Sequence, residues 1–222
     1  MIELPRKWES KLKKNTHYYS LVMNGISEFS AFLDDDLFFF PEYTNHGILH
    51  LKNTFYFAER FIHKNAYDSS CDEKGLCYKN ITVLVLSTLL HDLGMHITFE
   101  GFRCLLKSKK YSEANRFRKK SWSKLWEDFL QEAKRWNDQQ KNLIFGDSIT
   151  IQNIPDEKGL VNKYHKMLCG EFLRRNHHLL AFDIAKTGYP IKDEEVRPYI
   201  SISAECDPQL KDIIGIIAFL MA

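Results

Sequence analysis

Four residues in two short stretches of the chain have the types and spacing of a metal site. The stretch "EYTNHGILHLKN" places His46 and His50 four positions apart, and "STLLHDLGM" contains the adjacent pair His91 and Asp92. Residues four apart on a helix share one face, about one turn from each other. Imidazole nitrogens with a carboxylate form the mixed ligand set that suits manganese, iron, zinc, nickel or cobalt. The two stretches therefore predict one site for a divalent transition metal.

Each of these residues also has an ordinary structural explanation. A single histidine on an apolar face is usually a core residue with satisfied hydrogen bonds, and an aspartate near a helix end often only accepts a hydrogen bond. A buried carboxylate, however, is costly unless it is paired or holds a cation. Because the His-Asp doublet ends an apolar segment about forty residues after the first pair, we favour a shared metal site.

The elements that must position these residues are expected to be helices. Apolar residues recur at three- and four-residue steps over 18–33 and 49–61, and strand alternation is hard to find. The segment "ITVLVLSTLLHD" is rich in β-branched residues and is also compatible with a buried strand. Its length favours a buried helix, with Asn80 as N-cap and Gly94 as the helix stop.

Further helices are predicted towards the C-terminus of the chain. They cover 121–136, 162–185 and a last segment from about Pro208. The piece "TGYPIKDEEVRP" (187–198) is predicted to be a loop. Since the chain has no internal repeats and no low-complexity tract, we expect one all-α domain over residues 1–222, with a basic insertion at about 102–160.

Composition describes an ordinary globular chain, with 44% hydrophobic and 27% charged residues and a net charge of only +2. This overall charge does not indicate a polyanionic partner. Five scattered cysteines, none forming a CxxC pair, suggest a reducing compartment. The N-terminus lacks the apolar core of a signal peptide, and no run reaches the roughly 20 apolar residues of a membrane span. We therefore expect a cytoplasmic protein without a membrane partner.

The stretches "HGILH" and "LLHDLGM" resemble the HD superfamily of metal-dependent phosphohydrolases, all-α proteins named for their His-Asp pair. The resemblance implies an HD-domain helical bundle, with His50 as the first metal ligand and His91 and Asp92 as the doublet. The spacing of His46 and His50 is similar to that in cyclic-nucleotide phosphodiesterases. It implies that His46 is the general acid, so that His46 and Asp92 are the expected catalytic residues.

The wider pattern, which adds "HITFEG" and "FLRRNHH", is similar to the HD subgroup found fused to chaperone-type ATPase or cyclase modules. This resemblance covers roughly residues 40 to 222 and implies further domains of the same polypeptide. The final segment "IIAFLMA" shows no helix stop, so we expect the N-terminal part of a longer protein. The family's distal aspartate ligand is then expected just after Ala222, with Asp183, Asp207 and Asp212 as weaker substitutes.

Later histidines could serve a second metal, as in the two-metal members of the superfamily. His165, His177 and His178 lie on one predicted helix. In a continuous helix His165 and His177 are about 18 Å apart, at 1.5 Å per residue, which is too far to share a metal cluster. Either Gly170 breaks the helix or only one end reaches the site. The stretch "RRNHH" resembles the family better and favours His177.

Positive charge gathers in two places that could hold phosphate. Arg174 and Arg175 are adjacent, and the stretch 102–124 has nine Lys or Arg, among them Lys109 and Lys110, against one Glu. The aromatic residues interleaved with this stretch are Tyr111, Phe117 and Trp122. Either group could bind nucleotide or nucleic-acid phosphates, with the aromatic rings as stacking platforms. A solvated loop or helix face is the competing explanation.

Together these features predict a metal-dependent phosphohydrolase that acts on a nucleotide or nucleic-acid phosphoester, with one or two divalent ions. A cation held by His50, His91 and Asp92 would lower the pKa of a bound water and polarise a phosphoryl oxygen. The competing class is a non-catalytic HD module that senses a nucleotide or mediates assembly. An incomplete ligand set, or metal binding without turnover, would favour that class.

Overall fold

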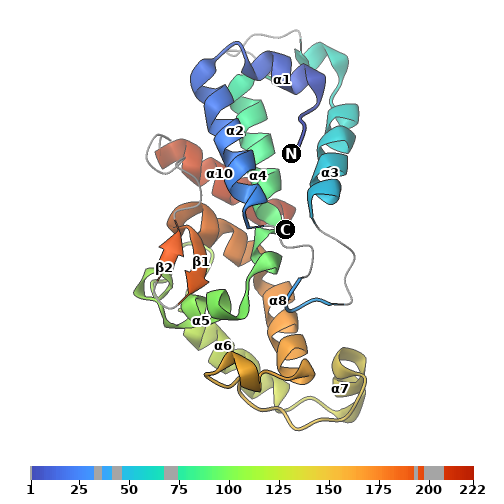
Figure 1. Cartoon of the computed structure of the whole chain (residues 1–222), viewed down its shortest axis with the longest axis vertical. Coiled ribbons are helices and arrows are strands. Elements are labelled where there is room, and N and C mark those ends of the chain that lie inside the picture. Colours follow the sequence, from blue (N-terminus) through green and yellow to red (C-terminus); the bar gives the residue numbers. More distant parts are fainter. Residues whose placement is uncertain (1, 33–36, 42–46, 68–74, 193–194, 198–207) are drawn as a thin grey trace.

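The computed structural model describes residues 2–32, 37–41, 47–67, 75–192, 195–197 and 208–222. These residues are mainly helical, which confirms the all-α fold class (Figure 1). The α-helices are α1 (Arg6–Leu12), α2 (Thr16–Ser30), α3 (Ile48–Phe61), α4 (Tyr78–His91), α5 (Phe99–Lys107), α6 (Trp122–Ala133), α7 (Asp138–Phe145), α8 (Lys163–Thr187) and α10 (Pro208–Met221). The short 3-10 helices are η1 (Lys64–Tyr67), η2 (Leu93–His96), η3 (Lys109–Tyr111) and η4 (Lys158–Leu160).

The helices gather at the two ends of an elongated molecule, as Figure 1 shows, with α1 to α4 at one end and α5 to α7 at the other. Helix α8 runs from the second group towards the middle, and α10 crosses α4 there. Helix α10 contacts both α4 and α8. The buried Ser87 hydroxyl of α4 donates a hydrogen bond to the Ile214 carbonyl of α10 at 3.1 Å. The two ends are therefore joined through α4, α8 and α10.

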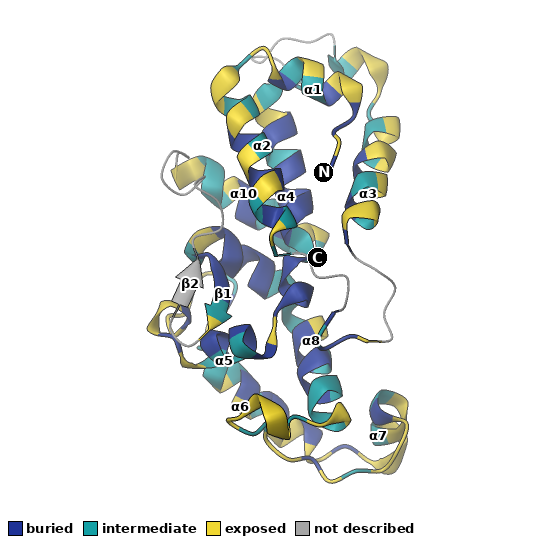
Figure 2. Cartoon of the chain, in the orientation of Figure 1, coloured by how far each residue is buried: buried dark blue, intermediate teal, exposed yellow. Residues whose placement is uncertain are grey.

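Helix α4 is the central helix of the first group. It contacts α1, α2, α3, α8 and α10, and most of its length is buried (Figure 2). Its β-branched residues have weak helix propensity, but burial against several neighbours stabilises the helix regardless. The helix predicted for this segment, rather than the strand, is confirmed.

The start of α4 differs from the prediction. Cys77, not Asn80, is the N-cap, and the Asn80 amide donates a hydrogen bond to the Gly75 carbonyl at 2.9 Å. Asn80 therefore lies in the first turn of α4, and its side chain stabilises the chain segment that precedes the helix. Cys77 is disulfide-bonded, contrary to the expectation of scattered free thiols, whereas Cys104 and Cys169 are free and buried.

The end of α4 also lies earlier than Gly94. The helix ends at His91, Asp92 is its C-cap, and the chain continues into η2. A β-carbon added at Gly94 would lie 2.8 Å from Leu180 Cδ2. Gly94 therefore allows η2 to pack closely on α8, and it is not the helix stop that the sequence predicted.

A small antiparallel hairpin replaces part of the loop predicted at 187–198. Strand β1 (Tyr189–Lys192) pairs with β2 (Glu195–Arg197), with Tyr189 opposite Arg197. Strand β1 packs against α5. Strands of three or four residues are too short to show an alternating pattern, which is why the sequence did not reveal them.

Helix α8 is continuous through Gly170, so that glycine does not break it. A β-carbon at Gly170 would lie 2.6 Å from the Phe39 carbonyl oxygen. The glycine instead lets the segment 37–41 cross α8 at close range. Gly170 therefore helps to fix the position of segment 37–41 against α8.

Replacing Gly170 with alanine is expected to destabilise the protein by roughly 1–3 kcal/mol, because the new methyl group overlaps a backbone oxygen that cannot easily move. Urea denaturation measures the change in the free energy of unfolding. Gly159→Ala is the matched control, since a β-carbon there meets no atom within 4 Å. Equal stability of the two variants would contradict the close crossing.

Within the described residues, no single helix has both the length and the apolar character needed to cross a membrane. The segments Tyr78–His96 and Phe99–Lys107 meet these criteria only as a pair, with a bend of 99° between them.

Candidate metal centre

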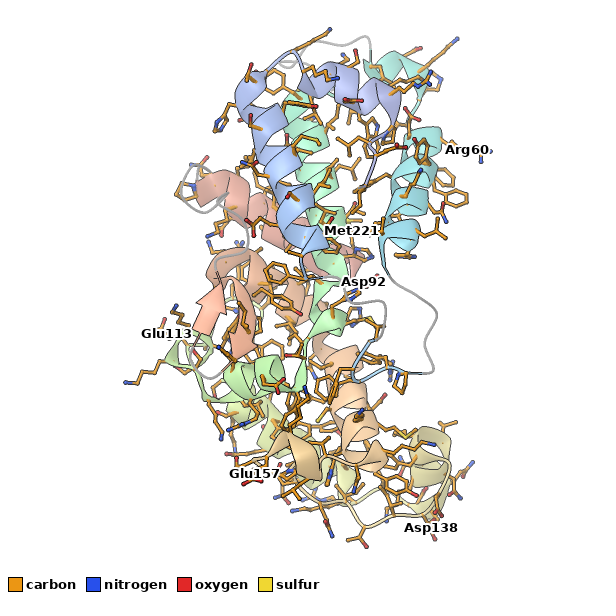
Figure 3. All side chains as sticks on the ribbon, viewed as in Figure 1. Arg60, Asp92, Glu113, Asp138, Glu157 and Met221 are labelled. Atoms are coloured by element: carbon orange, nitrogen blue, oxygen red, sulfur yellow. The ribbon has the colours of Figure 1, made fainter. Side chains whose placement is uncertain are left out.

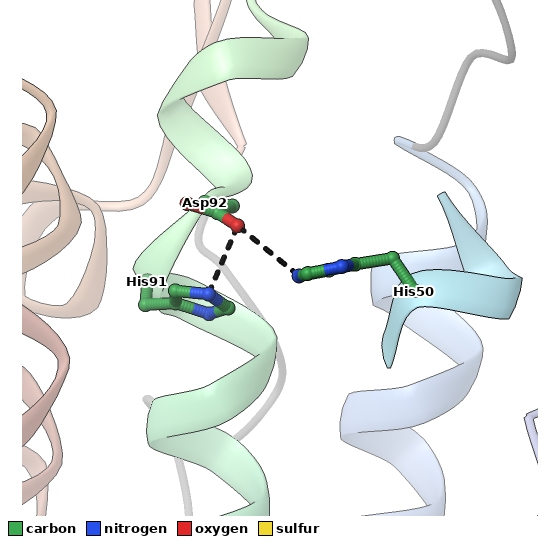
Figure 4. Close-up of side chains that lie close together, drawn as sticks. All are labelled: His50, His91 and Asp92. Carbon is green, nitrogen blue, oxygen red and sulfur yellow. Dashed lines mark ion pairs between the residues drawn. The ribbon is translucent and has the colours of Figure 1, made fainter. Parts of the chain in front are cut away.

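Three of the predicted ligands come together near the middle of the molecule. Asp92 lies between the two groups of helices (Figure 3). Figure 4 shows its carboxylate between the imidazoles of His91, the last residue of α4, and His50, in the first turn of α3. One ligand atom from each of the three side chains lies within 4.8 Å of the others. The arrangement joins residues about forty positions apart in the sequence.

The rotation of α3 about its axis places His50 at this site. Leu51 and Phe55 are four residues apart and buried, so they form the inner face of the helix. His50 precedes Leu51 and lies at the edge of that face, with a side chain 37% exposed. Its Nε2 atom is 3.6 Å from Asp92 Oδ2. The site is therefore open to solvent on the α3 side.

The orientation of His91 is fixed by the backbone of its own helix. Its Nδ1 atom lies 2.6 Å from the Thr88 carbonyl oxygen. A carbonyl can only accept a hydrogen bond, so Nδ1 carries a proton and donates it. The other ring nitrogen, Nε2, then faces Asp92 Oδ2 at 2.9 Å. A hydrogen bond from one ring nitrogen that leaves the other for a cation is the usual arrangement of a metal-binding histidine.

The spacing of the three ligand atoms fits a single cation. In the neutral ring, the Nε2 lone pair of His91 and the Asp92 carboxylate would repel each other at 2.9 Å unless a proton or a metal ion lay between them. Two atoms bonded to one ion at about 2.1 Å stand about 3.0 Å apart at a right angle and about 3.6 Å apart at 120°. The distances of 2.9 Å and 3.6 Å from Asp92 Oδ2 to the two histidine nitrogens are close to these two values. The residues present therefore fit a divalent metal.

The same contacts control the protonation of His91. Burial lowers the pKa of the imidazole, but the hydrogen bond and charge of Asp92, together with the Thr88 carbonyl, outweigh it. The pKa of His91 is therefore raised above its ordinary value of 6.5. The proton that the carboxylate attracts occupies the nitrogen that a metal would use.

Metal affinity is therefore expected to fall as the pH is lowered, and the fall should begin above pH 6.5. Below the pKa of His91, a metal must displace one proton from Nε2, which weakens its apparent affinity about tenfold per pH unit. Isothermal titration with Mn²⁺ or Zn²⁺ from about pH 5.5 to 8.5 measures this dependence. An affinity that stays constant down to pH 5.5 would contradict the role of His91 as a ligand.

Asp183 and Asp212 were the other candidate aspartate ligands that lie within the described residues. Both lie outside this cluster. Asp183 accepts hydrogen bonds from Arg118 and Trp122 in a buried group. Asp212 is an exposed partner of Lys186. Asp207 and His46 lie outside the described residues.

His165 and His177 are at different parts of α8 and cannot share a metal. They are separated by about 18 Å of continuous helix. His165 forms a capping box with Asn162 at the helix start. His177 lies three turns further on, and its Nδ1 is 2.6 Å from the Arg174 carbonyl, in the same geometry as His91. His177 is not part of the cluster formed by His50, His91 and Asp92.

The two predicted phosphate-clamping arginines are held by carboxylates. Arg174 makes two hydrogen bonds to Glu171, at 2.8 and 2.9 Å. Arg175 bonds Glu171 and Glu132, both at 2.7 Å. Their guanidinium groups are therefore fixed beside α6 and α8, and both line a cavity there.

Two of the three aromatic residues of the basic stretch, Tyr111 and Trp122, belong to the core and cannot serve as stacking platforms, whereas Phe117 is only partly buried. Tyr111 and Trp122 are fully buried. Phe117 stacks on Phe219 of α10, with ring centroids 4.3 Å apart. Arg118 is also buried, paired with Asp183 at 2.8 Å. The buried residues of this stretch thus anchor α5 and α6 to the rest of the fold.

Lys109 and Lys110 are exposed on η3, whose first turn is capped by the Ser108 hydroxyl. Neither lysine belongs to the cluster of His50, His91 and Asp92. Their predicted role in substrate binding is untested and stays a prediction.

Thr88 is the contributor to this site that the sequence did not reveal. It acts through its backbone carbonyl, which is independent of residue type, so no residue pattern marks it. The only available signal is its position three residues before His91 on a predicted helix, where a histidine side chain can reach back to the carbonyl.

The helical fold and the paired histidine and aspartate side chains define an HD-type domain. A family model described as HD-CE matches residues 40–221, and the chain therefore belongs to the HD-CE family. The match includes the whole of α3, α4, α8 and α10, the elements that form and support the candidate metal centre. Searches of curated proteins and of solved structures found no match.

Proposed function

We propose that this chain is a metal-dependent phosphohydrolase that acts on a nucleotide or nucleic-acid phosphoester. The observation that carries the proposal is the convergence of His50, His91 and Asp92 within 4.8 Å, in an HD-type domain. A divalent cation at these ligands would supply a water of lowered pKa and a Lewis acid for a phosphoryl oxygen. The exposed side of His50 leaves room for a phosphoester to approach.

The protein side chains have separate roles in this proposal. His91 and His50 contribute neutral nitrogen ligands, and Asp92 contributes the negative charge that partly balances a divalent ion. Thr88 holds His91 in the required tautomer. His46 is the proposed proton donor to the leaving oxygen, on the ground of its spacing from His50.

A hydrolysis assay tests the proposal. The purified chain is incubated with bis(p-nitrophenyl) phosphate and with a panel of nucleotides, separately with Mn²⁺, Fe²⁺, Co²⁺, Ni²⁺ and Zn²⁺. We expect release of p-nitrophenol or phosphate with at least one metal, and none after treatment with EDTA. Stoichiometric metal binding without turnover of any of these substrates would favour a non-catalytic HD module instead.

The role of His46 can be separated from that of His50. His46→Ala should retain the metal and lose about 10² to 10⁴ in the rate of phosphoester turnover, the usual contribution of a general acid. His50→Ala should lose metal affinity as well. The check is metal content and turnover measured on the same preparations. If His46→Ala loses as much metal as His50→Ala, His46 is a ligand and not the acid.

A further inference from the structure

A cavity of about 580 Å³ lies between α7, α8 and the segment 37–41. None of the three clustered metal ligands lines it. Its apolar walls include Phe39, Phe40, Leu143 and Met167, and the edge of Trp136 also reaches it. The close crossing of segment 37–41 over Gly170 forms one side of the cavity. The cavity therefore combines an apolar lining, whose aromatic members Phe39, Phe40 and Trp136 are buried, with a backbone that is held in place.

The rim of this cavity is positively charged. Lys163, Arg174 and Arg175 line it, together with the single carboxylate of Glu171. Glu171 bonds both arginines, and the Arg175 guanidinium also lies 5.3 Å from the centre of a Trp136 ring. These contacts fix the two guanidinium groups before any ligand arrives, which reduces the entropy lost on binding. Glu132 also neutralises part of this charge through its bond to Arg175, which leaves a surplus of one cation for an anionic ligand.

We infer that this cavity binds the nucleoside part of a nucleotide, with its phosphate at the rim formed by Lys163 and Arg174. The apolar wall, with Leu143 as its most exposed side chain, packs against a base, and the lysine and arginine at the rim attract a phosphate. The volume is in the usual range of small-molecule sites. The inference rests on the proposed function in one respect, namely that the bound nucleotide is the substrate of the metal centre.

Helix α8 connects the cavity with the metal centre. Arg174 at the rim precedes Leu180 by six residues, about 9 Å along the helix axis. Leu180 packs against Gly94, two residues after Asp92. Arg174 and Arg175 therefore lie at the end of the cavity wall nearer the metal centre, and Lys163 lies at its other end. One continuous helix thus links the cavity with the residues that pack beside the cluster.

Direct binding of nucleoside 5′-monophosphates tests this inference. The four common monophosphates, the corresponding nucleosides and inorganic phosphate are titrated into the full chain by calorimetry in the presence of EDTA. We expect at least one monophosphate to bind more tightly than both its nucleoside and inorganic phosphate. Failure of all four to bind at millimolar concentration, or equal binding of phosphate alone, would overturn the inference.

Two pairs of variants locate the binding site. Leu143→Asp puts a carboxylate on the cavity wall at a side chain that is 87% exposed, so folding should tolerate it, and Leu160→Asp is the control at a residue 64% exposed outside the cavity. Lys163→Glu reverses a rim charge, and Lys134→Glu is its exposed control. Each cavity variant should weaken monophosphate binding about tenfold or more, and each control should leave it unchanged. Equal effects of variant and control would overturn the assignment to this cavity.

Failure of the cavity proposal can be distinguished from failure of the proposed function at the metal centre. The His91→Ala, Asp92→Ala double variant should still bind the monophosphate in EDTA, because the cavity lies apart from these side chains. Binding without hydrolysis in the wild-type chain would support the cavity and count against the proposed function. Loss of nucleotide binding in a folded double variant would overturn the separate cavity site.

Discussion

Replacing both His91 and Asp92 with alanine is expected to reduce divalent-metal affinity by more than about 100-fold. Two of the three clustered ligand atoms are lost, and with them the only carboxylate charge in the cluster. Loss of a group that merely orients a ligand already costs about 10- to 100-fold, so loss of two ligands should cost more. Calorimetric titration and elemental analysis of the purified variant measure the effect.

His63→Ala is the matched control for this double variant. His63 is an exposed histidine just after α3, outside the cluster, so its removal should leave metal affinity unchanged. Circular dichroism establishes whether the double variant keeps its helices. Stoichiometric metal retained by a folded double variant would contradict the assignment of the site.

Replacing Asp183 with alanine is expected to destabilise the protein by roughly 3–5 kcal/mol, the largest stability effect predicted for a single residue here. Asp183 is buried on α8 and accepts hydrogen bonds from Arg118 at 2.8 Å and from the Trp122 indole at 2.7 Å. The Arg118 side chain is only 2% exposed. Without the carboxylate, a buried guanidinium has no counter-charge, and the connection between α8 and the start of α6 is lost.

Two comparisons separate this explanation from a general loss of packing. Asp212→Ala removes an exposed ion pair with Lys186 and should cost less than about 1 kcal/mol. Replacing Arg118 with methionine and Asp183 with leucine together should recover much of the loss, because no buried charge is left unpaired. Chemical denaturation gives the three free energies of unfolding. A loss for Asp183→Ala no larger than that for Asp212→Ala would contradict the account.

The cluster of His50, His91 and Asp92 could be predicted because residues of these types are rare in their sequence context. His91 and Asp92 end an otherwise apolar helix, and His50 lies on the predicted helix before it. Their residue types and spacing indicated which side chains could bind one metal ion. Their resemblance to HD proteins indicated that the two stretches form a single site. What the sequence could not provide is the orientation of each ring, since His91 is aligned by the Thr88 carbonyl.

The basic stretch could be predicted only in part. Its charge and its aromatic residues were compatible with a nucleic-acid surface or with a solvated face, but Arg118 and Trp122 both bond a buried aspartate some sixty residues away in the sequence. Such a long-range pairing depends on how α8 packs against α6. The composition of one stretch cannot show that a residue as distant in the sequence as Asp183 pairs with it. Buried arginines are also uncommon, so the sequence alone gives no reason to expect one at Arg118.

The glycines illustrate the same limit at single positions. Gly94 was expected to stop a helix, and a break at Gly170 was one of two alternatives for the later helix, because glycine has these effects locally. In the structure both lie where another segment approaches too closely for a side chain. Close approach between distant segments is a tertiary property, so the sequence showed that these positions are special but not why.

Anomalous X-ray diffraction from crystals grown with Mn²⁺ or Zn²⁺, recorded at the absorption edge of the metal, tests the central claim most directly. The account predicts one strong peak at about 2.0–2.3 Å from His50 Nε2, His91 Nε2 and Asp92 Oδ2. Metal bound at full occupancy elsewhere, with no peak among these three side chains, would contradict it.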